Sequence, residues 1–246
     1  MGGRCVRLVL WRMDNALKSV NNVSVIKTTY MKVFHYSDIE KWPKIKRGSW
    51  ESDGMPGLAP VLRVGAMHHG ARATGGVFAF TTPDPEEWID NKDFSNAWKR
   101  LCDNVGVLLV EIEVDSKDPG AFVFDWGHIE GFLNPTETTP EKYRHDTRLE
   151  AETAYFETRV PLGVYLEKQD DFDFALPEVV LTEHIPLERV GISPRQPFIE
   201  EMLETNKGRY SREEITHKLE MAPELKKWLE GYRERKALDE RGMRMR

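Results

Sequence analysis

The strongest constraint on the fold is a short apolar run that contains one carboxylate near its start. A buried strand is predicted for Leu176-Pro177-Glu178-Val179-Val180-Leu181-Thr182, which is rich in β-branched residues and too short for a helix. Burying a carboxylate is costly unless it has a partner, so the position of Glu178 near the start of this strand needs an explanation. That explanation is either a functional site or the capping of a turn at the strand entrance.

A second strand with polar residues is predicted far upstream. It comprises Val33-Phe34-His35-Tyr36-Ser37, in which one residue separates a histidine from a hydroxyl. A carboxylate on one strand and a histidine with a hydroxyl on another suit the binding of a ribose. The alternative is that His35 is a core histidine whose ring is satisfied by the backbone.

Hydrophobic periodicity predicts further strands and helices around these two segments. We expect strands over 76–80, 107–114 and 121–126, an extended segment over 160–166, and helices over 94–101, over 149–155 and from residue 199 onward. Thr82 is expected to cap a helix that runs through Trp88. Residues 48–76 are rich in glycine and predict a long irregular stretch, which in a compact domain is usually functional or mobile. Residues 125–128 stand at the end of a strand, where they could reach a cleft, but a surface turn is the default expectation.

Composition limits the class of protein. The chain of 246 residues is 31% charged and 40% hydrophobic, which is ordinary for a soluble globular protein. Its net charge of -6 gives no general case for binding nucleic acid or membranes, and no apolar stretch approaches the roughly 20 residues that cross a bilayer. Cys5 and Cys102 cannot form a disulfide framework, so we expect a soluble protein of the reducing cytoplasm. His68 and His69 are adjacent and point to different sides, so no metal site is expected.

Charge and patterning divide the chain into three parts. Residues 1–30 are basic and form an N-terminal extension, residues 31–195 form an α+β domain, and residues 196–246 form a helical C-terminal appendage that packs on the domain or on a partner. Met31 opens the first clean strand, so the domain is expected to begin there, with the upstream part dispensable. An added N-terminal strand or arm is the alternative.

The order of the motifs resembles the ADP-ribosyltransferase superfamily, in its His–aromatic–Glu branch on the side of diphtheria toxin and the poly-ADP-ribose polymerases. The resemblance spans roughly residues 31–194. It rests on His35-Tyr36-Ser37, on the strand Gly76-Val77-Phe78-Ala79-Phe80 and on Glu178, in this order along the chain. By resemblance, the α+β domain is expected to hold a split mixed β-sheet with flanking helices.

The resemblance implies an enzyme that uses NAD as a substrate and belongs to the glycosyltransferase class. Breaking the bond between nicotinamide and ribose builds positive charge on the sugar, and Glu178 would be the fixed carboxylate that stabilises this charge. By resemblance, His35 and Ser37 would bind the ribose of the adenosine half. The backbone of Tyr36 would bind the nicotinamide amide.

Aromatic rings would enclose the nicotinamide. Phe78 stands where the family has tyrosine, so the stacking surface is kept and the hydroxyl is lost. Trp88, on the following helix, would form the second wall. Both residues are otherwise ordinary core residues.

The acceptor of the ADP-ribose is expected to be a macromolecule, either protein or nucleic acid. Leu176 stands where arginine-modifying members carry a second Glu or Gln, which argues against an arginine acceptor. Tyr36 replaces a glycine common in the polymerase branch, which argues against polymer formation. No membrane partner is expected, and the oligomeric state is left open.

Two other functions are compatible with the same residues. The strand at 177–181 followed by Ile185-Pro186 is also similar to DNA-modifying members of the superfamily and to members that remove an RNA 2′-phosphate with NAD. For removal of the phosphate, Arg63 and Arg72 would be candidate phosphate ligands. The other alternative is a catalytically silent module that binds a nucleotide or a partner.

Overall fold

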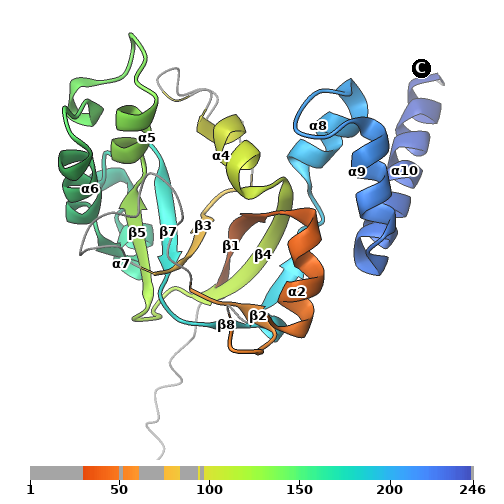
Figure 1. Ribbon diagram of the computed structural model, residues 1–246, viewed down its shortest axis with the longest axis horizontal. Coiled ribbons are helices and arrows are strands. Elements are labelled where there is room, and N and C mark those ends of the chain that lie inside the picture. Colours follow the sequence, from red (N-terminus) through yellow and green to blue (C-terminus); the bar gives the residue numbers. More distant parts are fainter. Residues whose placement is uncertain (1–29, 50–51, 61–74, 84–93, 95–96, 245–246) are drawn as a thin grey trace, which may run out of the picture.

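The computed structural model describes residues 30–49, 52–60, 75–83, 94 and 97–244 of the chain (Figure 1). The fold is α+β, as the sequence predicted, with one large sheet, flanking helices and a helical C-terminal region. Three predicted features lie outside the described residues: the N-terminal extension up to residue 29, the helix through Trp88, and the histidines and arginines of 61–74.

The large sheet has the strand order β6-β5-β7-β3-β1-β4-β9. Its members are β1 (Tyr30–Ser37), β3 (Val77–Phe80), β4 (Leu108–Asp115), β5 (Ala121–Asp125), β6 (Val160–Pro161), β7 (Pro177–Leu181) and β9 (Val190–Ile192). A mixed sheet was expected, but every pairing between the described strands is antiparallel. Strands β2 (Gly57–Leu58) and β8 (Ile185–Pro186) form a separate antiparallel pair.

The sheet has a seam between β1 and β3. Strand β1 pairs with β4 over eight consecutive positions, from Tyr30 to Ser37, whereas its register with β3 joins Phe34 to Phe80. One half of the sheet therefore consists of β6, β5, β7 and β3, and the other of β1, β4 and β9. In Figure 1, β5 and β7 run upright while β4 curves obliquely away from them.

The core follows the alternation of the strands. Ala79, Val179 and Val123 are aligned across β3, β7 and β5, and Val33 is aligned with Ile112 across β1 and β4; all five are fully buried. Most side chains at the alternate positions of β3, β7 and β5 are also buried, so both faces of these strands are largely covered. This double coverage explains why β7 is apolar apart from Glu178.

Helices lie at both ends of the sheet. They are α2 (Trp42–Arg47), α4 (Ala97–Val105), α5 (Gly127–Leu133), α6 (Arg148–Glu157) and α7 (Leu162–Glu167), with short 3₁₀ turns at Ile39–Lys41, Glu141–Tyr143, Gln169–Asp171 and Leu187–Arg189. Figure 1 shows α5, α6 and α7 beside β5 and β7, at the opposite side of the molecule from the C-terminal helices.

The extended segment predicted over 160–166 is wrong after its second residue. The chain forms β6 only at Val160 and Pro161 and then enters α7. Pro161 has no amide hydrogen to continue a strand ladder, and its φ of -56° leads readily into a helix. Leu162 and Tyr165 are both buried, which is the spacing of a helical face.

The helical C-terminal appendage is confirmed and comprises α8 (Pro197–Thr205), α9 (Arg212–Glu220) and α10 (Pro223–Arg244). It packs against the start of the domain, since the Tyr210 hydroxyl donates to Asp38 Oδ2 at 3.2 Å and Lys46 of α2 pairs with Glu224 of α10. Trp228 of α10 also donates to the carbonyl of Pro194 at 3.1 Å. The three helices stand together beside α2 in Figure 1.

Candidate functional site

Glu178 lies in a row of side chains that crosses the sheet. The register aligns Phe34 of β1 with Phe80 of β3, Phe80 with Glu178 of β7, and Glu178 with Phe124 of β5. Aligned residues of neighbouring strands point to the same face, so the carboxylate stands between the two phenylalanines that flank it. Glu178 is fully buried, with an exposed fraction of 0%.

Tyr155 of α6 supplies a partner for this buried carboxylate. Its hydroxyl donates a hydrogen bond to Glu178 Oε2 at 2.7 Å. The ring of Tyr155 stacks on Phe124, with centroids 4.8 Å apart and planes inclined by 18°. A buried carboxylate with a charge-assisted hydrogen bond is a stable arrangement, so Glu178 is held in place by α6 from one side of the sheet.

His35 connects the two halves of the sheet. Its Nδ1 donates a hydrogen bond to the backbone carbonyl of Phe78 at 2.7 Å, across the seam from β1 to β3. A carbonyl only accepts, so this contact places a proton on Nδ1; in a neutral imidazole, Nε2 would then be the acceptor nitrogen. Because side chains alternate along β1, His35 leaves the strand on the opposite side from Phe34, which shares the row of Glu178.

Tyr36 and Ser37 are buried side chains, at 3% and 4% exposure. The Tyr36 ring packs edge-to-face on Phe198 of α8 at 5.9 Å, and its hydroxyl donates to the carbonyl of Pro83 at 3.4 Å. The turn before β4 approaches the backbone of Ser37 closely, since Gly106 has a φ of 118° and a Cβ there would collide with the Ser37 carbonyl. The Tyr36 side chain therefore joins β1 to the C-terminal helices.

Phe78 is half-buried and stands on the same face of the sheet as Glu178. It is aligned with Val180, two residues beyond Glu178 on β7. This spacing places its ring diagonally next to the carboxylate, within reach of one ligand. Trp88, the predicted second wall, lies outside the described residues.

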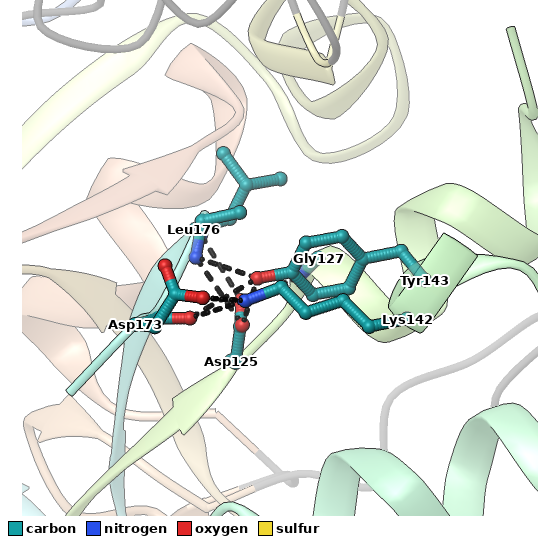
Figure 2. Close-up of polar contacts among 7 residues, drawn as sticks. Asp125, Gly127, Lys142, Tyr143, Asp173 and Leu176 are labelled. Carbon is teal, nitrogen blue, oxygen red and sulfur yellow. Dashed lines mark hydrogen bonds and ion pairs between the residues drawn. The ribbon is translucent and has the colours of Figure 1, made fainter. Parts of the chain in front are cut away.

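Asp125 organises the entrance of β7 (Figure 2). Its Oδ1 accepts from the backbone amides of Gly127 and Leu176 at 2.9 and 3.0 Å, and its Oδ2 accepts from the Tyr143 hydroxyl at 2.7 Å. The amide of Ala175 donates to the Tyr143 oxygen at 3.0 Å. Asp125 thus fixes the backbone immediately before Glu178.

The surface turn predicted over 125–128 is wrong, because Asp125 is only 1% exposed and Trp126 and Gly127 are buried. The carboxylate is satisfied by backbone amides and a phenol, which offsets the cost of burying its charge. Burial and the neighbouring Asp125 carboxylate raise the pKa of Tyr143 far above its usual value, so the phenol remains a donor. Asp125 therefore has a structural role.

Tyr155 is the residue of this site that the sequence did not indicate. Its position on a helix was predicted, and a tyrosine on the buried face of a helix implies that its hydroxyl needs a partner. The sequence contains no signal that identifies Glu178, on a later strand, as that partner.

Among the residues that the structure describes, no group of three or more histidine, cysteine, aspartate or glutamate side chains is arranged to hold a metal ion. Within the same residues, no helix has the length and apolar character needed to span a bilayer. Comparisons of the chain with models of protein families, with curated proteins and with solved structures return no match. The candidate site is therefore defined by its own geometry.

Proposed function

We propose that this protein transfers ADP-ribose from NAD to a macromolecular acceptor. The observation that carries the proposal is the adjacency of three motifs that are far apart in the sequence. His35 on β1 is bonded to the backbone of Phe78 on β3, and the end of β3 is aligned with Glu178 on β7. The three motifs on which the resemblance rests therefore lie on the neighbouring strands β1, β3 and β7, which supports the proposal.

The seam between β1 and β3 is the place where NAD would lie. Because side chains alternate along a strand, His35 and Glu178 point to opposite faces of the sheet. One ligand would contact both residues only by passing from one face to the other at the seam. The nicotinamide ribose would then lie near Phe78 and Glu178, and the ribose of the adenosine half near His35. Nε2 of His35 is the nitrogen that would accept a hydrogen bond from a ribose hydroxyl.

The chemistry follows from the position of the carboxylate. The bond between C1 of the ribose and the nicotinamide nitrogen breaks, its electron pair leaves with nicotinamide, and the sugar becomes an oxocarbenium-like cation. The fixed charge of Glu178 stabilises this cation, as carboxylates do in glycoside cleavage. A nucleophile of the acceptor then bonds to C1 and loses its proton.

The finer points of the proposal rest on the sequence. Leu176 and Tyr36 argue against an arginine acceptor and against polymer formation, and the proposed cytoplasmic location rests on the cysteine content alone. The acceptor is proposed to be a protein or a nucleic acid. The arginines that would favour removal of an RNA 2′-phosphate, Arg63 and Arg72, lie outside the described residues.

Release of nicotinamide from NAD tests the proposal directly. We expect the protein to release it, and Glu178→Gln to lower kcat by about 100-fold or more with little change in NAD affinity, because the amide keeps the size and removes the charge. Glu130→Gln is a matched control, since Glu130 is also buried but pairs with Arg100 of α4. Incubation with labelled NAD and candidate acceptors, followed by mass spectrometry, would identify the modified group.

A catalytically silent nucleotide-binding module is the second candidate. The complete burial of Glu178 favours it, because the carboxylate must meet the ribose in order to act. This candidate predicts that NAD raises the melting temperature without being cleaved. Unchanged turnover in Glu178→Gln would exclude the catalytic role of this residue.

A further inference from the structure

We infer that Tyr155 positions Glu178 for NAD cleavage, an inference that rests on the proposed function. The Tyr155 hydroxyl donates to Glu178 Oε2 at 2.7 Å, and both residues are buried, at 3% and 0% exposure. This length is typical of a hydrogen bond between a hydroxyl and a carboxylate, which is among the stronger kinds in proteins. Tyr155 would act through Glu178 and not on the substrate.

The ring of Tyr155 is held by aromatic neighbours. It stacks on Phe124 at 4.8 Å, and it makes an edge contact with Phe156 at 5.3 Å and 71°. Phe124 is the residue aligned with Glu178 on the adjacent strand β5. The stacking partner of the phenol and its hydrogen-bond acceptor are therefore cross-strand neighbours, which sets the direction of the hydroxyl relative to the carboxylate.

The backbone of Tyr155 is fixed as well. Thr158 Oγ1 donates to the Tyr155 carbonyl at 2.6 Å and accepts from the amide of Asp125, at the end of β5, at 2.9 Å. At the other end of α6, Thr147 and Glu150 form a capping box. The helix is thus attached to β5 beside Tyr155 and is closed at its start, so the phenol is presented from a rigid support.

Such a support matters because orientation is a large part of catalysis. A displacement of about 1 Å at a reacting group can cost about 100-fold in rate. A hydrogen bond that fixes Oε2 also fixes the direction of Oε1 on the same carboxylate. Tyr155 would therefore contribute to kcat, with little effect on the affinity for NAD.

Steady-state nicotinamide release tests this inference in the wild type, Tyr155→Phe, Glu178→Gln and the double variant, with Tyr165→Phe as a control. Tyr155→Phe keeps the ring and removes the hydroxyl, so we expect kcat to fall by about 10- to 100-fold with KM for NAD within about two-fold. In the Glu178→Gln background, Tyr155→Phe should cause no further loss, because a positioning residue has nothing left to position. Tyr165→Phe, which removes a hydroxyl from a buried tyrosine stacked on Phe172 and Phe174, should leave kcat unchanged.

The possible results separate the inference from the proposed function. If the wild-type protein releases no nicotinamide, the proposed function fails and the inference falls with it. If the wild type is active and Tyr155→Phe keeps the wild-type kcat, only the inference is overturned. The same holds if Tyr155→Phe lowers kcat by the same factor in the wild-type and Glu178→Gln backgrounds. If Tyr155→Phe does not fold, Phe124→Leu decides, because it keeps the hydroxyl and removes its stacking partner; an unchanged kcat in that variant overturns the inference.

Discussion

The side-chain amide of Gln196 pairs with the backbone of Leu109 as a neighbouring strand would. The Leu109 amide donates to Gln196 Oε1 at 2.8 Å, and Gln196 Nε2 donates to the Leu109 carbonyl at 2.8 Å. Gln196 is fully buried and directly precedes α8, so this contact joins the C-terminal helices to β4, which lies next to the edge strand β9 of the large sheet. The appendage is therefore attached to the strand that pairs with β1.

Replacing Gln196 is expected to destabilise the whole domain. Gln196→Leu has similar bulk but leaves the buried amide of Leu109 without its acceptor, which costs about 1–3 kcal/mol. Urea denaturation should show a lower midpoint with an unchanged slope. Gln169→Leu, at an exposed position in a 3₁₀ turn, is the matched control and should leave the midpoint unchanged. Equal midpoints for both variants would contradict this role.

His35 is expected to affect NAD binding more than stability. His35→Ala removes the hydrogen bond to the Phe78 carbonyl and the proposed ribose ligand, so the increase in melting temperature caused by NAD should largely disappear. His35→Asn can still donate toward that carbonyl, so it should recover stability without recovering the NAD response. His217→Ala, exposed on α9, serves as the control. A full NAD response in His35→Ala would mean that this histidine has a structural role only.

Substitutions at Phe78 test the proposed nicotinamide site most directly. Phe78→Leu should cost less than about 1.5 kcal/mol of stability, because it exchanges one apolar side chain for another. Loss of the π surface, worth about 0.5–1.5 kcal/mol, should lower NAD affinity several-fold. Phe78→Tyr should be tolerated or should raise turnover.

The matched control for Phe78 is Phe122→Leu. Phe122 is also half-buried and stands at the same level of the sheet, since both residues are aligned with Val180. Titration calorimetry should show that NAD binding is indifferent to this change. If it is equally indifferent to Phe78→Leu and Phe78→Tyr, Phe78 is a core residue and the proposed site is wrong.

His128 is expected to make the protein sensitive to acid. Burial lowers the pKa of His128, the Asp125 carboxylate opposes this, and the nearby His145 and Lys142 lower it further. The native state therefore binds fewer protons at this residue than the unfolded chain, so stability falls as the pH drops below about 6.5, the ordinary value for histidine. The contact between His128 Nδ1 and His145 Nε2 at 3.1 Å also requires that one of the two nitrogens be unprotonated.

Melting temperatures measured from pH 8 to pH 5 in steps of about one unit would test this expectation. The loss of stability on acidification should be smaller in His128→Gln, which cannot be protonated, than in the wild type. His217→Gln, at an exposed position, should follow the wild-type curve. Identical curves for His128→Gln and the wild type would show that other groups cause the acid sensitivity.

Local patterns were sufficient for most of the elements. The apolar run after Glu178, the alternation around His35 and the helical periodicity of residues 149–155 all correspond to observed elements, because each pattern reports the local periodicity of a strand or helix. The segment after Pro161 was misassigned, because a short apolar run is compatible with either a strand or a helix. The turn at Asp125 was assigned to the surface because the partners of this carboxylate, Tyr143 and Leu176, lie elsewhere in the sequence.

The sequence by itself determined that this protein is an α+β domain with a helical C-terminal region, and that a glutamate lies near the start of a buried strand. These properties depend on neighbours along the chain. Only the tertiary structure decided that β1, β3 and β7 lie side by side, that Tyr155 is the donor to Glu178, and that Gln196 completes the pairing of Leu109. The physical reason is that a buried polar group takes whichever partner the packing of strands and helices brings to it, at any distance along the chain.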